Sequence, residues 1–308
     1  MHPSEEPEND RSFGPHLALI GVQVFFGSLP VIAKVVLKVI PAVSLVGFRV
    51  GITALVFALI QALRGRFWLK EKSDYWKLAV LSLFGVTFNQ LLFITGLSLT
   101  KASNTSLLAV TIPIFTVVVS SAVGTERPRP VKFFGILLAA AGVILLIDPQ
   151  KASFSSQTTM GDLLIVANSL CYGIYVATSK KTITQNGAFR SMMWVFIFAS
   201  IICIPLGINS TTQIDLSTVS PLIGLLILYI AIGATASPYL LNAWALARVT
   251  PSTVAVYIYL QPLIGFLLAV IFLNEPIDAK FALSSTLIFV GVFLVTFRLG
   301  TFETKPAL

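Results

Sequence analysis

Ten long apolar segments constrain this chain more than any other feature of its sequence. They cover residues 15–38, 41–63, 76–99, 102–123, 131–148, 160–180, 189–208, 219–246, 251–273 and 279–298. An α-helix needs about 20 apolar residues to cross the hydrocarbon core of a bilayer. Barrel strands of about 10 residues with alternating polarity are a poor match to such continuous runs. We therefore predict an all-α polytopic membrane protein with ten transmembrane helices.

The composition argues against the soluble classes of protein. Of the 308 residues, 56% are hydrophobic and 11% are charged, whereas about 25% are charged in an average soluble domain. The mean hydropathy is +0.89. Because such a chain cannot cover a globular surface with polar side chains, the composition excludes a soluble enzyme, a disordered chain and a disulfide scaffold.

The basic residues indicate how the chain is oriented in the membrane. Cytoplasmic loops of membrane proteins carry an excess of Lys and Arg. With the N-terminus inside, the inner loops and tails carry 15 basic residues and the outer loops carry 5. We therefore expect both termini in the cytoplasm of a cell whose inner or plasma membrane holds the chain, with membrane lipids around it. The net charge of +8 lies in short runs between apolar segments, so we expect no nucleic-acid binding.

The two halves of the sequence resemble each other. Three pairs of residues are 149 positions apart, namely Pro113 and Pro262, Glu126 and Glu275, and Gly142 and Gly291. Two further pairs have similar spacings, Gly85 with Gly233 and Lys34 with Lys180. Because five helices per half is an odd number, the second half must enter the membrane upside down. Many secondary transporters have such inverted repeats, with the substrate site near the midplane between them.

The repeat pattern predicts the domain organisation. We expect a cytoplasmic tail at 1–14, a first repeat at 15–148, an outer connecting loop at 149–159, a second repeat at 160–298 and a cytoplasmic tail at 299–308. The sequence predicts no particular oligomeric state.

Several motifs resemble those of the EamA-type, ten-helix members of the drug/metabolite transporter superfamily. They are the run FGSLPVIAK at 26–34, Phe48-Arg49, Pro113 followed by Gly124-Thr125-Glu126, and Pro262 followed by Leu273-Asn274-Glu275-Pro276. The resemblance covers residues 15–298 as two tandem repeats, although Phe26 stands where the family more usually has tryptophan. It implies a ten-helix inverted-repeat fold and the export or exchange of small solutes such as amino acids or other metabolites.

The acidic and histidine residues limit the chemistry that the chain can perform. All thirteen carboxylates lie in tails, loops or helix ends, whereas proton- or sodium-coupled carriers often use a buried one. Both histidines lie in or beside the N-terminal tail, which argues against a His-ligated metal and a Ser–His nucleophile. We therefore expect no enzyme activity, no metal and no cofactor. We expect Glu126 and Glu275 to fix loop geometry, while a coupling role for Asp148 or Asp162 remains an alternative.

Arg49 is the one charge well inside a predicted span. It lies about 12 Å along the helix from Pro41, and a central Arg costs about 2.5–3.5 kcal/mol on insertion scales. Its guanidinium therefore needs carbonyls, water, a helix end or a substrate anion around it. Bracing of helix packing and binding of an anionic substrate both remain open. We expect Lys34 and Lys180 to extend toward the membrane surface, with a role as gating pairs as the alternative.

Polar and aromatic residues within the predicted helices are candidates for a substrate pocket. They are Gln23, Asn89, Gln90, Tyr172, Tyr175, Tyr239, Asn242, Trp244, Tyr257 and Gln261, with Ser28, Asn168, Ser237 and Tyr259 beside them. Polar groups are costly in lipid, so most of them should face the interior of the bundle, where each could equally hold helices together.

Four prolines are candidates for hinges or gates, because proline removes a backbone hydrogen bond from a helix. They are Pro30, Pro113, Pro238 and Pro262. Pro113 and Pro262 occupy matching places in the two halves, which is typical of the broken helices of transporters. Kinked packing without gating is the alternative.

Together these features predict a secondary transporter that works by alternating access between two five-helix halves. The leading hypothesis is export of amino acids or related amphipathic solutes through a central aromatic and polar pocket. One alternative is uptake or exchange of an organic anion that binds Arg49. Another is a membrane receptor or assembly protein that binds without transporting.

Overall fold

A computed structural model provides the structure of the protein and describes residues 13–65, 67–100, 104–105, 108–126, 129–147, 158–212, 219–264 and 279–296. Every regular element within these ranges is a helix. Helices are favoured because lipid offers no partners for backbone N–H and C=O groups, so each segment must satisfy them internally. The predicted all-α class is confirmed for this part of the chain.

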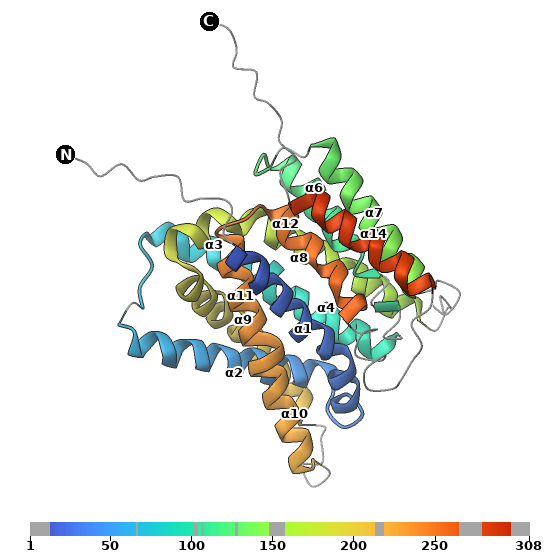
Figure 1. Ribbon diagram of the computed structural model, residues 1–308. Coiled ribbons are helices and arrows are strands. Elements are labelled where there is room, and N and C mark those ends of the chain that lie inside the picture. The colour runs from blue at the N-terminus through green and yellow to red at the C-terminus, as the bar shows by residue number, and fades with distance from the viewer. Residues whose placement is uncertain are drawn as a thin grey trace, which may run out of the picture.

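The helices follow the apolar segments of the sequence (Figure 1). Those of the first half are α1 (Phe13–Val36), α2 (Ala42–Leu63), α3 (Lys72–Ser82), the π-helical turn η1 (Leu83–Thr87), α4 (Phe88–Leu99), α6 (Thr111–Ala122) and α7 (Pro130–Ile147). Those of the second half are α8 (Thr159–Asn186), α9 (Ala188–Thr211), α10 (Pro221–Ala231), the π-helical turn η4 (Ile232–Ala236), α11 (Ser237–Leu246), α12 (Pro251–Val256), the 3₁₀ turn η5 (Tyr257–Tyr259) and α14 (Ala279–Thr296).

Six helical stretches of the described chain are long and apolar enough to cross a membrane. They are α1, α2, the α3–η1–α4 rod, α8, α9 and the α10–η4–α11 rod, and three shorter apolar helices cover Thr111–Ala122, Pro130–Leu145 and Ala282–Thr296. The ninth predicted segment, 251–273, is helical through 264, and its remainder lies outside the described residues. The structure thus supports a polytopic membrane protein, while the count of ten spans stays a prediction.

The fourth predicted segment contains a turn. Within the predicted span 102–123, residues 104, 105 and 108 are helical, a turn follows at residues 109–110, and α6 begins at Thr111. Pro113 lies in the first turn of α6, directly after this break, where a missing N–H has no intrahelical partner to lose. Pro30 lies inside α1, and the roles of both prolines as hinges or gates stay predictions.

Matching helices of the two halves lie side by side and antiparallel. Gly47 of α2 meets Gly207 of α9 near the start of one helix and the end of the other. At the opposite end, the Arg64 guanidinium lies 4.9 Å from the centre of the Phe189 ring. Glycines allow this close approach of helix backbones, as is common in membranes.

The α7–α14 pair repeats this arrangement. A Cβ on Gly135 would lie 2.9 Å from the carbonyl oxygen of Gly291, and one on Gly142 would lie 2.9 Å from that of Ser284. The residue numbers rise on one helix as they fall on the other, so these helices are also antiparallel. In Figure 1 the α7–α14 pair forms one edge of the molecule, away from α2 and α9.

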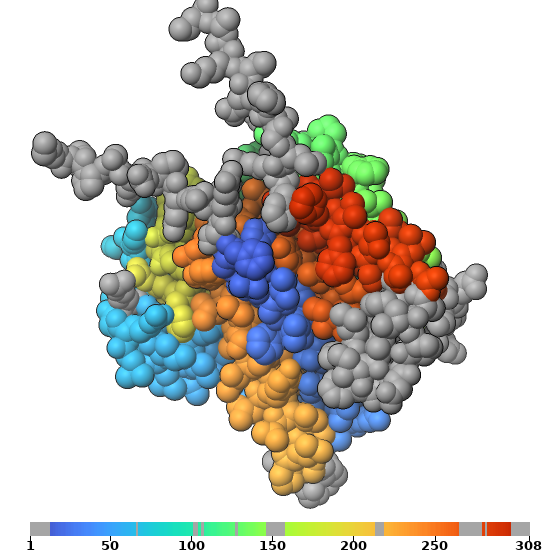
Figure 2. Space-filling model, in the orientation of Figure 1, coloured from blue at the N-terminus to red at the C-terminus, as the bar shows by residue number. Residues whose placement is uncertain are grey.

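The other helices enclose the interior. α4 and α6 pack on α8, and α1 packs on α11; Figure 2 shows α1 in blue beside the orange α10–α11 rod. Along α1, Val31 is 68% exposed while Leu29 is 4% exposed, although both are apolar. A wide apolar outer surface of this kind suits contact with lipid and is rare on soluble monomers.

Candidate functional site

A cavity lies between helices of the two halves. Its polar wall consists of Arg49, Asn89, Gln90, Asn168, Tyr172, Tyr239 and Gln261, and its apolar wall of Phe26, Leu29, Phe93, Ala109, Ile112, Ile165 and Ile258. The space between these side chains is about 640 Å³, including the part open to solvent. Small-molecule sites in proteins combine apolar walls with a few polar groups, as this cavity does.

The structure brings half of the predicted pocket residues to this cavity. Asn89, Gln90, Tyr172, Tyr239 and Gln261 line it, together with Arg49. The others support the lining or lie apart from it. Gln23 accepts a hydrogen bond from Gln261 at 2.8 Å, and Asn242 donates one to the Tyr172 hydroxyl at 2.6 Å.

Tyr175, Tyr257 and Trp244 do not line the cavity. The Tyr175 ring centre lies 6.2 Å from that of Tyr172, and its hydroxyl lies 3.5 Å from the sulfur of Met192. The Tyr257 hydroxyl lies 2.7 Å from Nδ1 of His16. The Arg248 guanidinium lies over the Trp244 ring, 4.1 Å from the ring centre, so Trp244 makes a cation–π contact.

The apolar wall is the part of the cavity that sequence reasoning missed. Phe93, Ile112 and Ile165 have the same residue types as the lipid-facing positions, so their composition carries no signal. Asn168 was recognisable as a polar residue within a span, and it accepts a hydrogen bond from Asn89 at 2.6 Å.

Hydrogen bonds join the halves across the cavity. The Tyr239 hydroxyl of α11 lies 3.0 Å from Oδ1 of Asn89 and 2.9 Å from the carbonyl oxygen of Gly85. Asn89 in turn donates to Asn168 of α8. A ring edge contact with Phe196, at 5.1 Å between centres, holds Tyr239 in place. This network connects the first-half rod to two helices of the second half.

The α3–η1–α4 rod and the α10–η4–α11 rod both contribute to the cavity wall, and each contains a π-helical turn. Such turns are rare and often occur at functional sites, because a wider turn leaves carbonyls without their regular partner. In η1 the carbonyl of Gly85 accepts a hydrogen bond from the Tyr239 hydroxyl. Next to η4, the carbonyl of Ile230 accepts a hydrogen bond from the Thr235 hydroxyl at 2.6 Å. The carbonyl of Ala231 accepts one from the Thr53 hydroxyl at 2.9 Å.

Arg49 is buried on the cavity wall. It is 2% exposed, and its Nε donates to the Thr235 hydroxyl at 3.0 Å. It therefore braces α2 against η4, which was one of the two roles left open by the sequence. No Asp or Glu is among the lining residues that the structure describes. The guanidinium thus contributes an uncompensated positive charge to a largely apolar space.

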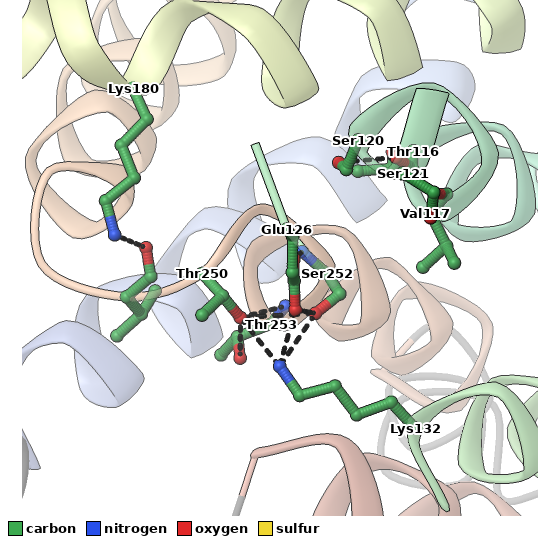
Figure 3. A network of polar contacts seen from close by, with 11 residues as sticks. Thr116, Val117, Ser120, Ser121, Glu126, Lys132, Lys180, Thr250, Ser252 and Thr253 are labelled. Atoms are coloured by element: carbon green, nitrogen blue, oxygen red, sulfur yellow. Dashed lines mark hydrogen bonds and ion pairs between the residues drawn. The ribbon is translucent and has the colours of Figure 1, made fainter. Parts of the chain in front are cut away.

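A second polar network joins the halves at one end of the molecule, away from the cavity (Figure 3). Glu126 lies just past the end of α6, and its carboxylate accepts from the backbone N–H of Ser252 at 3.1 Å and from the Ser252 hydroxyl at 2.6 Å. Lys132 of α7 lies 2.5 Å from the same carboxylate. Ser252 belongs to the first turn of α12, where a carboxylate is favoured by the free N–H groups and the helix dipole.

These contacts also set the protonation of Glu126. Burial by itself raises the pKa of Glu126, but the hydrogen bonds from Lys132 and Ser252 and the charge of Lys132 outweigh it, so that the pKa lies below its ordinary value. The carboxylate is therefore ionised at neutral pH and binds α12 in its charged form.

Asp162 joins the halves at the opposite end. It lies in the first turn of α8 and accepts hydrogen bonds from the Thr100 hydroxyl at 2.6 Å and from Asn104 Nδ2 at 3.0 Å. Nearby, Lys34 donates to the carbonyl of Thr100 at 2.8 Å, and its counterpart Lys180 donates to that of Val249 at 2.8 Å. Both lysine side chains thus bind a helix end. Asp148 and Glu275 lie outside the described residues.

The chain is similar over two segments to a known family. The family model described as "EamA-like transporter family" matches residues 14–148 and 159–297. An uncharacterized transporter of Archaeoglobus fulgidus is 29% identical over 73% of this chain and 77% of its own length. One from Vibrio cholerae is 27% identical over 94% of each chain, and YetK of Bacillus subtilis, also an uncharacterized transporter, is 21% identical over 96% of this chain and 91% of its own.

A solved crystal structure shares the fold. It superposes with a TM-score of 0.75 and 18% sequence identity, covering 92% of this chain and 96% of the other. The family match covers nearly all of the apolar segments as two repeats, and the helices and cavity described above belong to both. The chain is a multi-pass membrane protein and belongs to the EamA-like transporter family.

Proposed function

We propose that the protein is a secondary transporter that carries small amphipathic solutes, amino acids or related metabolites, out of the cell by alternating access. The observation that carries this proposal is the cavity between the halves, which combines amide and phenol groups with apolar side chains. Asn89, Asn168 and Tyr239 each lie well inside a helical stretch that is long enough to span a membrane. Their position favours a site near the membrane midplane, where transporters with inverted repeats bind substrate.

The antiparallel packing of matching helices supports the inverted repeat. α2 corresponds in sequence to α9, and α7 corresponds to α14. Within each pair the two helices run in opposite directions and pack closely at glycines. The π-helical turns η1 and η4 occupy the same place in their rods. We extend this pattern to two five-helix repeats over 15–148 and 160–298.

Contacts between connecting segments agree with the expected division of these segments between two sides of the membrane. Segments expected inside meet one another, since the backbone N–H of Lys70 donates to Asn186 at 3.1 Å and Lys132 lies beside Thr250. Segments expected outside also meet, as Lys34 does with Thr100. The placement of both termini in the cytoplasm rests on the basic residues of the sequence.

Two polar contacts between the halves provide gates at opposite ends of the cavity. Glu126 with Ser252 closes the inner end, and Asp162 with Asn104 closes the outer end. Each pairs a carboxylate of one half with donors of the other. Breaking one contact while the other holds would expose the cavity to one side at a time, as alternating access requires.

Counterflow in proteoliposomes tests the proposal. Vesicles loaded with unlabelled solute are given labelled amino acids or organic anions, with and without an imposed pH gradient. We expect saturable exchange that does not respond to the gradient, because the described cavity wall has no carboxylate to carry a proton. Uphill flux driven by protons would contradict a facilitative carrier, and binding without any flux would favour a receptor.

Exchange or uptake of an organic anion is the second candidate function. It is favoured by one observation, the buried Arg49 guanidinium on a wall without acidic residues. Faster counterflow of dicarboxylates than of zwitterionic amino acids would select this candidate over the first.

A further inference from the structure

Gln90 carries a buried amide group on the cavity wall. Its side chain is 2% exposed, and neither Oε1 nor Nε2 has a partner with hydrogen-bond geometry among the described residues. The residue lines the cavity, as Tyr239 does. A buried polar group without a partner costs about 1–3 kcal/mol. Such a cost is expected where a ligand supplies the missing partner.

Arg49 reaches the same cavity from the neighbouring helix α2, which packs on α4. A guanidinium has five N–H donors in a planar fork. The structure gives it one hydrogen bond, from Nε to the hydroxyl of Thr235. The two terminal nitrogens have no recorded partner in the described part of the chain. Arg49, Gln90 and Tyr239 all line this cavity, so the free groups of Arg49 and Gln90 adjoin the same space.

We propose that Arg49 and Gln90 form a head-group site for a carboxylate, and that the rest of the substrate lies along the apolar wall. A carboxylate has two oxygens that fit the fork of a guanidinium, and the amide N–H of Gln90 supplies a further donor. The apolar wall opposite includes Phe93, Ile112 and Ile165. This inference rests on the proposed function, because it names the substrate class of the same cavity.

The described lining has no carboxylate to match a positively charged group. A cationic head group would meet the Arg49 charge without a carboxylate to offset it, and like charges in a dry site repel strongly. An amino group next to the carboxylate can donate to the neutral Oε1 of Gln90. The cavity should therefore bind aromatic and aliphatic carboxylates with or without an amino group, and should reject the corresponding amines.

Direct binding to the purified full-length chain in detergent tests this specificity. The probes are 3-phenylpropanoate, phenylalanine, 3-phenylpropan-1-ol and 3-phenylpropylamine, measured by isothermal titration calorimetry. We expect the two carboxylates to bind about 10- to 100-fold more tightly than the alcohol and the amine, because a hydrogen bond to a charged group is worth about one to two decades in affinity. Equal affinity of the alcohol or the amine would overturn the proposal.

Variants separate recognition from packing. Gln90→Glu keeps the shape of the side chain but places a carboxylate beside Arg49, so it should abolish the preference for carboxylates in a protein that remains folded. Gln90→Leu should weaken carboxylate binding about tenfold. Gln61→Leu, which removes a buried amide of α2 away from the cavity wall, is the matched control and should leave the preference unchanged.

The brace and the charge of Arg49 are separated in the same way. Thr235→Val removes the hydroxyl that holds Nε and should lower thermal stability while the carboxylate preference persists. Arg49→Lys retains the charge without the fork and should keep part of the preference. An unchanged preference in both Gln90→Glu and Arg49→Lys would show that these two side chains do not recognise the carboxylate and would overturn the proposal.

The outcomes distinguish this inference from the proposed function. Carboxylate-selective binding without counterflow of any probe would support the head-group site and contradict transport. Saturable counterflow of the alcohol and the amine as well as the carboxylates would support transport and overturn the head-group site.

Discussion

At the residue scale, Tyr239 connects the halves through one hydroxyl group. It reaches both the Gly85 carbonyl of η1 and the side chain of Asn89, while its ring packs edge-on against Phe26 and Phe196. The hydroxyl and the ring thus have separate roles. The hydroxyl satisfies backbone freed by the π-helical turn, and the ring fills space beside the cavity.

Tyr239→Phe should separate these two roles. The ring contacts remain, but the Gly85 carbonyl and Asn89 lose a donor, so we expect the protein to be destabilised by about 0.6–2 kcal/mol. Unfolding of the purified protein by denaturing detergent measures the change. Tyr229→Phe is the control, since its hydroxyl binds Ser28 at an exposed position. Equal effects of the two substitutions would contradict this account.

At the element scale, α14 packs on α7 through backbone. A Cβ on Gly291 would lie 2.5 Å from the Gly135 carbonyl oxygen and 2.6 Å from the backbone nitrogen of Ala139. Neither atom can move without shifting a helix. We expect Gly291→Ala to destabilise the protein by about 1–3 kcal/mol, as overpacking does.

A thermal unfolding midpoint in detergent measures this effect. Gly224→Ala is the matched control, because a Cβ on Gly224 of α10 meets no atom within 4 Å. We expect the control to be neutral or slightly more stable, since alanine is the better helix former. A Gly291→Ala protein as stable as the control would show that the two helices are not in close contact.

Long elements were predictable from the sequence, whereas their local departures from helix were not. The apolar runs locate α2, α9 and α7 because hydrophobic length alone decides where a chain can cross lipid. The π-helical turns at Leu83–Thr87 and Ile232–Ala236 lie in equally apolar sequence, and they depend on hydroxyls from distant residues such as Tyr239. The apolar cavity wall could not be predicted either, because buried and lipid-facing positions carry similar residues. Leu29 and Val31, for example, differ in burial although both side chains are aliphatic.

At the scale of the whole molecule, the proposed inner gate depends on the Glu126 contact. We expect Glu126→Gln and Lys132→Gln to open it, because each removes a charge-assisted bond across the halves. Opening should increase the labelling rate of Ala109→Cys on the cavity wall about tenfold, when a membrane-impermeant thiol reagent is added from the cytoplasmic side of a Cys171→Ala/Cys203→Ala protein.

The control for this experiment is Lys77→Gln. It also removes an ion pair, with Asp74, but that pair lies within α3 and does not join the halves. Its labelling rate should match that of the parent protein. Unchanged labelling in both Glu126→Gln and Lys132→Gln would contradict an inner gate at this contact.

The pH dependence of the inner contact follows from the lowered pKa of Glu126. A carboxyl group whose pKa is lower in the closed state stabilises that state above its ordinary pKa, and the contribution is lost as the pH falls through the lowered value. The labelling rate of Ala109→Cys is divided by that of a free thiol at the same pH, because only the thiolate reacts. This ratio should stay constant between about pH 5 and 8 and rise only below about pH 4. An increase near pH 6 would contradict an ionised Glu126 in the closed contact.

The α7–α14 contact uses corresponding surfaces of the two halves, with Gly135 and Gly142 on one side and Gly291 on the other. An interface that matches itself under a two-fold rotation can also hold together two copies of one chain. If the two halves are inverted repeats as proposed, a five-helix chain with this glycine face could pair with an upside-down copy of itself. Gene duplication would then need to supply only a linker, since the surface between the halves would already exist.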